Sequence, residues 1–387
     1  MMRVAVQPEM FRWARERAGL DVLALRSRFP HLAAWEQGEA QPTLRQLARY
    51  ARATHAPLGY FFLPAPPEEP LPIPDFRTIG GRVIARPSAD LLDTLYACQA
   101  RQAWFRDEAL VTGQRPLPFI ASMDIAIAPD RAADQLRQTL GFSVQARREC
   151  SSWSEALRLF IAQADALGVL VMVSGVVGSN NTRVLDPEEF RGFALADALA
   201  PLVFVNGSDS KSAQMFTLAH ELAHLWLGQS ALSDAGVEGA GEPQHGAGVE
   251  RWCNQVAAEL LVPLPEFIAA LREGELLDDA MRRLAREFKV STLVVLRRLL
   301  DVGRLSRDAF WQAFRAEQAR LVAIQAASSG GGDFYRTTTA RVGKRFARSL
   351  VESTLEGRTL YRDAFHMLGI AKPGTFNELG RSLGLPI

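Results

Sequence analysis

The chain has little cysteine, and the cysteines it has are far apart. Its 387 residues include Cys98, Cys150 and Cys253, and no two of them form a C-x-x-C pair. This spacing argues against a disulfide framework and against a cysteine-based zinc site. We therefore interpret Cys253, which falls in a predicted helix, as a small core residue and not as a metal ligand.

Long hydrophobic runs and an excess of charge of one sign are also absent. No stretch approaches the roughly 20 apolar residues of a transmembrane helix, and the start of the chain lacks the apolar core of a secretory signal. The chain holds 44 basic and 43 acidic residues, which argues against a chain-wide surface for nucleic acid or an anionic membrane. We expect a cytoplasmic protein without a membrane contact, in which any affinity for DNA is local.

The most informative segment that is present is HELAH, at residues 220–224. On an α-helix, His220 and His224 lie one turn apart on the same face and can bind one metal ion, while Glu221 can face a water molecule on that ion. Hydroxyl and carboxylate groups precede the segment and a glycine follows it, as at the two ends of a helix. The pattern predicts a Zn²⁺ site of the peptidase type, in which Glu221 is the catalytic base.

A hydrolytic zinc site needs three protein ligands and one open position, so a third ligand is expected downstream. Residues 250–263 predict a second amphipathic helix with two candidates, Glu250 and Glu259. In thermolysin-like sites the ligand glutamate is followed four positions on by a polar residue that hydrogen-bonds a zinc histidine. Glu250 is followed by Asn254 at that spacing, whereas Glu259 is followed by proline. We therefore favour Glu250 as the ligand, with Asn254 behind it.

These segments resemble the ImmA/IrrE family of zinc metallopeptidases, with a helix-turn-helix domain of the XRE type fused at the N-terminus. Residues 214–228, residues 250–263 and the N-terminal module carry the resemblance, which spans most of the chain. It implies a zincin-like core built from a small sheet and the metal helix. It also implies proteolysis of a regulatory protein, such as a repressor, in the control of phage, mobile-element or stress genes.

A second class of function stays open beside the endopeptidase. The chain could be a DNA-binding transcription regulator, or a partner that neutralises a cognate toxin, in which the zinc fold does not cleave protein. The resemblance keeps this alternative open because family members can lie beside toxin genes. A purely structural zinc is disfavoured, since Glu221 has no use in such a site and structural sites prefer four Cys or His ligands.

Residues 1–64 are predicted to form the helix-turn-helix domain, of the five-helix type. We predict helices at residues 11–18, 21–28, 30–37 and 43–53. Nine arginines against five acidic residues leave a modest basic surface. The candidate DNA contacts are Arg26, Arg28, His31 and Gln37. The third helix offers no Arg, Lys or Asn for base contacts, so DNA binding and a degenerate domain used for protein contacts are both open.

The remaining chain predicts a mainly α fold with a small β-sheet, in the α+β class. A proline-rich linker at residues 65–82 leads to a zincin-like domain at 83–305 and a helical C-terminal module at 306–387. Further helices are predicted at residues 87–114, 132–140, 154–167 and 277–300, the first with its arginines outward and the last broken into two near residue 289. Strands are predicted at residues 168–174, 190–196 and 201–206.

Two expectations concern partners. The glycine-rich segment 229–249, which contains His245, reads as a lid beside the metal helix. An exposed strand edge beside the metal would let a peptide substrate add as one more strand. The partners we consider are a protein substrate, DNA through residues 1–64, a cognate toxin and a second copy of the chain in a homodimer.

Overall fold

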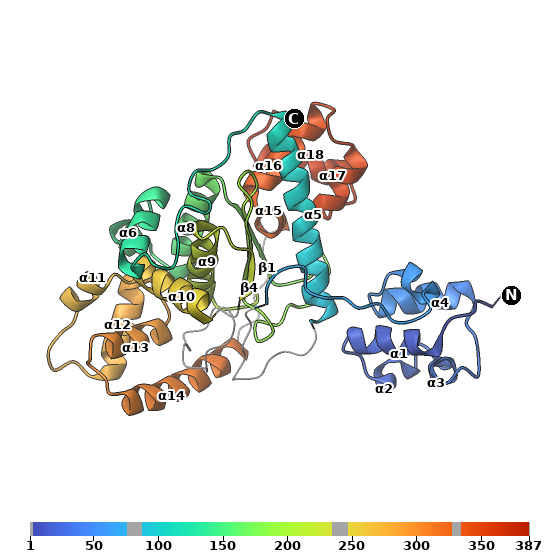
Figure 1. Cartoon of the computed structure of the whole chain (residues 1–387), viewed down its shortest axis with the longest axis horizontal. Coiled ribbons are helices and arrows are strands. Elements are labelled where there is room, and N and C mark those ends of the chain that lie inside the picture. The colour runs from blue at the N-terminus through green and yellow to red at the C-terminus, as the bar shows by residue number, and fades with distance from the viewer. Residues whose placement is uncertain (1–2, 76–86, 234–246, 327–333, 387) are drawn as a thin grey trace. The chain divides into compact units, whose positions relative to one another are not determined.

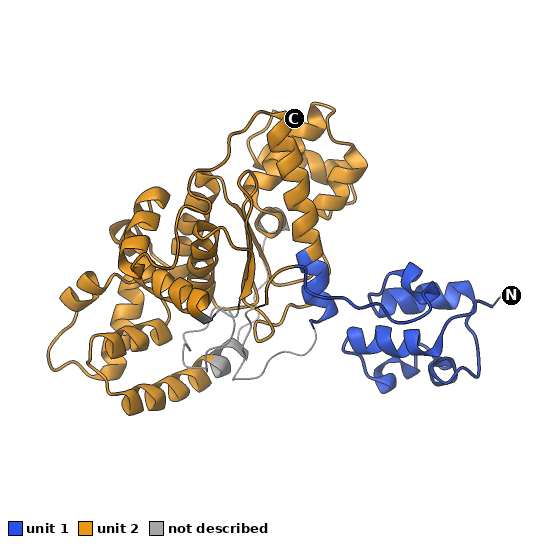
Figure 2. Ribbon diagram, viewed as in Figure 1, with its two compact units in different colours: residues 1–72, 85–95 blue, residues 73–84, 96–387 orange. Residues whose placement is uncertain are grey.

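The computed structural model describes residues 3–75, 87–233, 247–326 and 334–386 (Figure 1). Within these residues the chain is mainly helical and contains one four-stranded sheet, which confirms the predicted α+β class. The chain divides into two compact units (Figure 2). Unit 1 comprises residues 1–72 and 85–95, and unit 2 comprises residues 73–84 and 96–387. Among the described helices, none has the length and apolarity needed to cross a membrane.

Unit 1 is a small helical unit. Its helices are α1 (Pro8–Arg17), α2 (Val22–Arg26), α3 (Leu32–Glu36), α4 (Leu44–Ala53) and the 3₁₀ helix η1 (Leu58–Phe62). The third of these is shorter than the predicted helix at residues 30–37. The chain at residues 29–32 forms a tight turn instead, in which the Leu32 amide donates to the Phe29 carbonyl, and Gly38 ends the segment with a φ of 75°.

Aromatic rings form the core of unit 1. Phe11, Trp35, Tyr50 and Phe61 are all buried, and the ring centroids of Phe11 and Tyr50 are 5.6 Å apart. The Tyr50 hydroxyl donates to the Phe11 carbonyl at 2.8 Å, so its one polar atom is satisfied inside the core. α4 is held at its start by a capping box in which Thr43 accepts from the Gln46 amide and Gln46 accepts in return.

The sheet of unit 2 has the order β1-β3-β2-β4. Its strands are β1 (Leu170–Ser174), β2 (Gly192–Leu195), β3 (Leu202–Asn206) and β4 (Ala231–Ser233). β1 pairs with β3 in parallel, whereas β2 is antiparallel to both β3 and β4. Nearly every strand residue is buried, because helices cover both faces, and this explains the continuous hydrophobic runs in the sequence.

The first three strands lie where the sequence predicted them, but β4 was not predicted. It falls at the start of the segment that we interpreted as a lid. Its three residues are too few for a pattern of alternation, and its position depends on pairing with β2, far away in the sequence. The rest of that segment, residues 234–246 with His245, lies outside the described residues.

Helices lie on both sides of the sheet in unit 2 (Figure 1). α8 (Trp153–Leu167) contacts β1, and α9 (Lys211–Trp226) contacts β2 and β3 on the same side. α15 (Phe334–Val342) and α16 (Lys344–Leu355) contact β1 from the other side. The sheet is therefore the middle layer of three, and α9 lies directly against it.

The predicted helix at residues 87–114 is α5 (Ala89–Val111), whose residues from 96 onward belong to unit 2. Arg101 was expected to face outward but is only 9% exposed, and its Nε donates to the Met367 carbonyl at 3.1 Å. The expectation was wrong because this part of α5 contacts both the sheet and the C-terminal helices, as the Gln102 side chain, which donates to the Leu195 carbonyl, also shows.

The remaining helices of unit 2 surround the central layers. They are α6 (Pro129–Leu140), α7 (Val144–Arg148), α10 (Ala247–Leu261), α11 (Leu264–Ala269), α12 (Leu277–Phe288), α13 (Thr292–Asp301), α14 (Arg307–Ala326), α17 (Tyr361–Leu368) and α18 (Pro373–Ser382). α10 packs between α6 and α9, and the apolar side chains of all three helices belong to one large core. The break predicted near residue 289 is present, with Lys289 at a φ of 53° and Ser291 capping α13.

Candidate metal centre

The helix α9 carries the segment at residues 220–224 through the middle of unit 2. Ser210 caps its start by accepting from the Ala213 amide at 3.2 Å, and Gly228 follows its end with a φ of 68°. Every residue from Gln214 to Trp226 is buried. Burial of polar groups is unfavourable unless they are paired, so the three polar side chains at residues 220, 221 and 224 require a local explanation.

His220, His224 and Glu250 converge on one point. The two Nε2 atoms are 3.1 Å apart, and the Glu250 carboxylate oxygens lie 3.1 Å from His220 Nε2 and 3.0 Å from His224 Nε2. Ligand atoms around a tetrahedral Zn²⁺ lie about 3.3 Å from one another when each bond is about 2.0 to 2.1 Å. The three groups offer one ligand atom each at close to that separation, so they fit a shared divalent ion.

Asn254 supports the first of these imidazoles from behind. Its Oδ1 lies 3.0 Å from His220 Nδ1, on the side of the ring away from the carboxylate. When the amide oxygen accepts from Nδ1–H, the lone pair of Nε2 is free to face a metal. Glu250 and Asn254 lie one turn apart on α10, so a single helix face supplies both a candidate ligand and the group that orients a second one.

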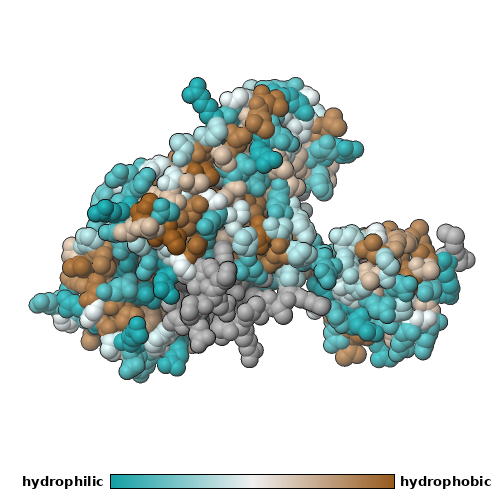
Figure 3. Space-filling view, in the orientation of Figure 1, coloured by the Kyte–Doolittle hydropathy of each residue, from teal (hydrophilic) through white to brown (hydrophobic). Residues whose placement is uncertain are grey.

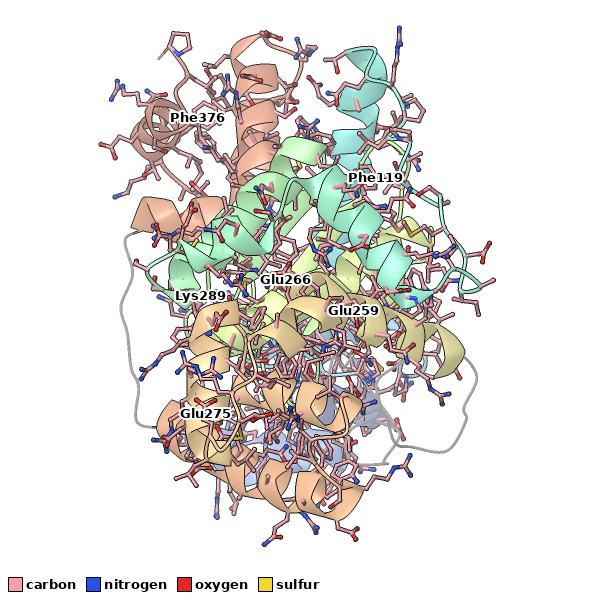
Figure 4. All side chains as sticks on the ribbon, turned by 90° about the vertical axis from the view of Figure 1, so that its left-hand side faces the viewer. Phe119, Glu259, Glu266, Glu275, Lys289 and Phe376 are labelled. Atoms are coloured by element: carbon pink, nitrogen blue, oxygen red, sulfur yellow. The ribbon has the colours of Figure 1, made fainter. Side chains whose placement is uncertain are left out.

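Glu259, the rival third ligand, has different partners. It lies nine residues after Glu250, about 13 Å further along the helix axis at a rise of 1.5 Å per residue. Its Oε1 is 3.0 Å from a guanidinium nitrogen of Arg298, and its Oε2 accepts from the Leu264 amide at the start of α11. Figure 4 shows Glu259 in the helical layer that also carries Glu266 of α11. Glu259 therefore joins helices together, at a distance from the two histidines.

Glu221 is buried beside this cluster. Neither of its carboxylate oxygens has a hydrogen-bond partner within bonding distance among the described residues. Burial raises the pKa of Glu221 to about 8; the adjacent His220 and the Ser233 hydroxyl oppose this rise, and Glu250 adds to it. A fully buried carboxyl group without a close hydrogen bond is unfavourable for folding, and such groups are concentrated at functional sites.

A glycine allows the sheet to approach Glu221 closely. A Cβ atom on Gly192 of β2 would lie 2.5 Å from the Thr217 side chain and 3.4 Å from Cγ of Glu221. Such a contact with Thr217 is too short for any larger residue, so this position needs glycine. Glu221 thus lies between α9 and the first residue of β2.

Ser233 is a residue of the centre that the sequence reasoning missed. It is fully buried at the end of β4, opposite Gly192 in the register, and its Oγ lies 3.4 Å from His224 Nε2. A lone serine before a glycine-rich segment carries no motif in the sequence. The signal that identifies it is the pairing of β4 with β2, which only the folded chain reveals.

The carboxylate of Glu250 and the two imidazoles shift one another's pKa values. Burial alone would raise the pKa of Glu250, but His220 and His224 lower it to about 2. Burial alone would lower the pKa of His220, yet the Glu250 carboxylate raises it above its ordinary value. Burial lowers the pKa of His224. An ionised carboxylate together with two imidazoles forms a donor set that a Zn²⁺ ion prefers at a hydrolytic centre.

The four candidate DNA contacts belong to unit 1 and are all exposed. Arg26 is the last residue of α2, while His31 and Gln37 are the cap residues on either side of α3. The Arg28 guanidinium lies 5.8 Å from the centroid of the Phe29 ring. With only five helical residues, α3 offers a shorter surface to a DNA groove than the sequence predicted.

Two family models match parts of the chain. Residues 164–300 match a family model described as the IrrE N-terminal-like domain, and residues 342–382 match the model of a domain of unknown function. No curated protein matches the chain. The first match spans β1 to α13 and includes every residue of the candidate centre, which supports a metallopeptidase-like function for this region.

Proposed function

We propose, from the premise that residues 164–300 form an IrrE N-terminal-like peptidase domain, that this chain is a zinc-dependent endopeptidase. Its substrate would be a regulatory protein, such as a repressor or an antitoxin, and cleavage would change gene expression. The observation that carries the proposal is the convergence of His220, His224 and Glu250 within 3.1 Å of one another, beside the fully buried carboxyl group of Glu221.

In this proposal, His220, His224 and Glu250 would hold a Zn²⁺ ion, which when bound polarises a peptide carbonyl and lowers the pKa of water. Glu221 accepts the proton of the attacking water at its carboxylate and delivers it to the leaving amine. Asn254 keeps the His220 ring in the tautomer and orientation that the site requires.

The test is Glu221→Gln in the full chain. We expect this variant to bind one equivalent of zinc and to keep the wild-type circular dichroism spectrum, but to lose cleavage of an unfolded protein such as β-casein by at least 100-fold, because only the base is removed. Glu273→Gln is the matched control, since Glu273 is exposed. Undiminished cleavage by Glu221→Gln would reject the assignment. Proteomics on cells with wild-type and Glu221→Gln protein would then identify the natural substrate.

A second role concerns unit 1, which would bind DNA or a protein partner such as a toxin. Figure 3 shows hydrophobic residues on the visible face of unit 1. The exposed hydrophobic residues of this unit include Leu23, Leu44 and Phe62, and this favours a protein contact. The discriminating variant is Arg26→Ala/Arg28→Ala in the full chain. If the unit binds DNA, the variant weakens binding and lowers the dependence of log K on log salt by about two charges. An unchanged salt dependence would favour the protein contact.

A further inference from the structure

The strand β4 lies at the edge of the sheet next to the candidate metal centre. Among the described strands it pairs with β2 alone, and its last residue, Ser233, has its Oγ 3.4 Å from His224 Nε2. The edge of a sheet presents unpaired amide and carbonyl groups, to which an extended peptide can add as a further strand. A peptide that adds to β4 would therefore pass beside the metal ligands.

That edge is already in contact with another part of the chain. The Leu232 amide, in the middle of β4, donates to the Pro74 carbonyl at 3.0 Å, and Asp75 pairs with Leu232 in a parallel bridge. We call residues Ile73–Asp75 the strap. The strap comes from the proline-rich segment that the sequence predicted as a linker, and it belongs to unit 2.

The strap is anchored by a side chain as well as by the backbone. Ile73 is 8% exposed, although the residues around it in the segment, Pro72, Pro74 and Asp75, are exposed. Burial of the isoleucine side chain stabilises this position of the strap. Pro74 has no N–H group and therefore cannot extend a regular ladder with β4. Within the part of the chain that the structure describes, the buried Ile73 side chain and the backbone bond from Leu232 to Pro74 thus hold the strap at β4.

We propose that the strap is an intramolecular occupant of the edge at which the protein substrate binds, so that an extended peptide must displace it from β4. This inference rests on the proposed peptidase function. β4 has three residues, with Leu232 as the central one. The Leu232 amide, which donates to the strap, could donate to a substrate carbonyl in its place. While the strap occupies β4, a peptide cannot bind at this edge and reach the candidate metal centre. Binding requires that the strap leave.

The first experiment locks the strap with a disulfide. Asp75→Cys and Leu232→Cys introduced together place two thiols on paired residues, and thiol titration before and after mild oxidation measures closure. The three natural cysteines are buried and remain as background, and each single variant is a control. Failure of the pair to close would overturn the contact itself.

The binding of two probes is then measured on the zinc-loaded double-cysteine variant. Acetohydroxamate requires only the metal, whereas an alanine tripeptide with a terminal hydroxamate also requires the strand edge. We expect oxidation to weaken tripeptide binding at least tenfold, reduction to restore it, and acetohydroxamate binding to stay constant. Equal tripeptide affinity in the two redox states would overturn the proposal.

The second experiment does not depend on zinc, so it separates the strap from the peptidase function. In Ile73→Asp the buried anchor becomes charged, and we expect hydrogen exchange of the Leu232 amide to accelerate at least tenfold. Leu63→Asp, at an exposed position in unit 1, is the control. If no variant binds zinc, the peptidase proposal fails while the exchange rates still decide the strap. Equal exchange in Ile73→Asp and wild type would overturn the strap.

Discussion

The two ends of α10 present the same residue type in two different environments. Glu250, near the start, faces two imidazoles, whereas Glu259, near the end, pairs with the Arg298 guanidinium and accepts from the first amide of α11. A guanidinium is permanently charged and has no lone pair for a metal, so the pair at the end of the helix can only be structural. An imidazole can offer a lone pair to a metal. The residue that faces each glutamate, more than the glutamate itself, therefore distinguishes a candidate metal site from a structural ion pair.

Replacement of Glu250 should break this comparison most severely. We expect Glu250→Gln to lose stoichiometric zinc and all peptidase activity, because the neutral amide leaves only two imidazole ligands. Metal analysis after gel filtration measures the loss. The paired variant Glu259→Gln should retain one zinc per chain. Zinc retention by Glu250→Gln together with zinc loss by Glu259→Gln would reverse our assignment of the two ends.

Replacement of Asn254 tests whether the orientation of the His220 ring contributes to the affinity for zinc. In Asn254→Leu the amide that holds the His220 ring is absent, and we expect the affinity for zinc to fall by roughly 10- to 100-fold while some binding remains. Competition with a fluorescent chelator measures the affinity. Asn254→Asp, which keeps an acceptor oxygen, should recover most of it, and equal affinities for Leu, Asp and wild type would exclude an orienting role.

Replacement of Glu259, near the end of α10, should change the stability of the fold and not the binding of zinc. Removal of the Glu259 charge leaves Arg298, which is 5% exposed, with only Asp301 as a carboxylate partner in the described residues. We expect Glu259→Gln to lower the free energy of unfolding by about 2 kcal/mol, since loss of one partner leaves a buried charge poorly compensated. Urea denaturation of zinc-loaded protein measures it. A change of less than about 0.5 kcal/mol would show that this pair is not a structural ion pair.

A third carboxylate, Asp165 of α8, sharpens the comparison because burial dominates there. Burial raises the pKa of Asp165 to about 7, even though the Val171 amide, Arg345 and Lys344 oppose the rise. The folded state therefore binds the proton more tightly than the unfolded chain, and stability falls as the pH rises from about 4 to 7. We expect Asp165→Asn to stabilise the fold by about 1 kcal/mol at pH 8, and by less at pH 5. Denaturation at both values checks the sign, and a gain that is larger at pH 5 would contradict it.

Much of this structure could be predicted from local patterns in the sequence. The helix α9 could be predicted because histidine spacing, capping residues and the following glycine all act within a few turns. The preference for Glu250 over Glu259 used the spacing of Asn254, which lies one turn away on the same helix and whose Oδ1 lies 3.0 Å from His220 Nδ1. The assignment of Glu250 as a ligand stays a prediction. The strands β1, β2 and β3 could be located because burial on both faces demands continuous apolar runs.

The features that escaped prediction depend on contacts between distant segments. β4 and Ser233 take their places by pairing with β2, and the strap reaches β4 from more than 150 residues away in the sequence. Arg101 is buried because α5 meets helices near the end of the chain. In each case the residue type alone suggests exposure or a loop, and the partner that changes the outcome has no trace in the local pattern.

The lack of a side chain at Gly192 has a consequence for the spacing of β2 and α9. Even a methyl group at this position would lie 2.5 Å from the Thr217 side chain. Any side chain at this position would push the strand outward and carry its antiparallel neighbour with it, drawing the Ser233 hydroxyl away from the imidazoles. The absence of a side chain at Gly192 therefore sets how closely β2 approaches α9, and with it the place of the Ser233 hydroxyl beside His224.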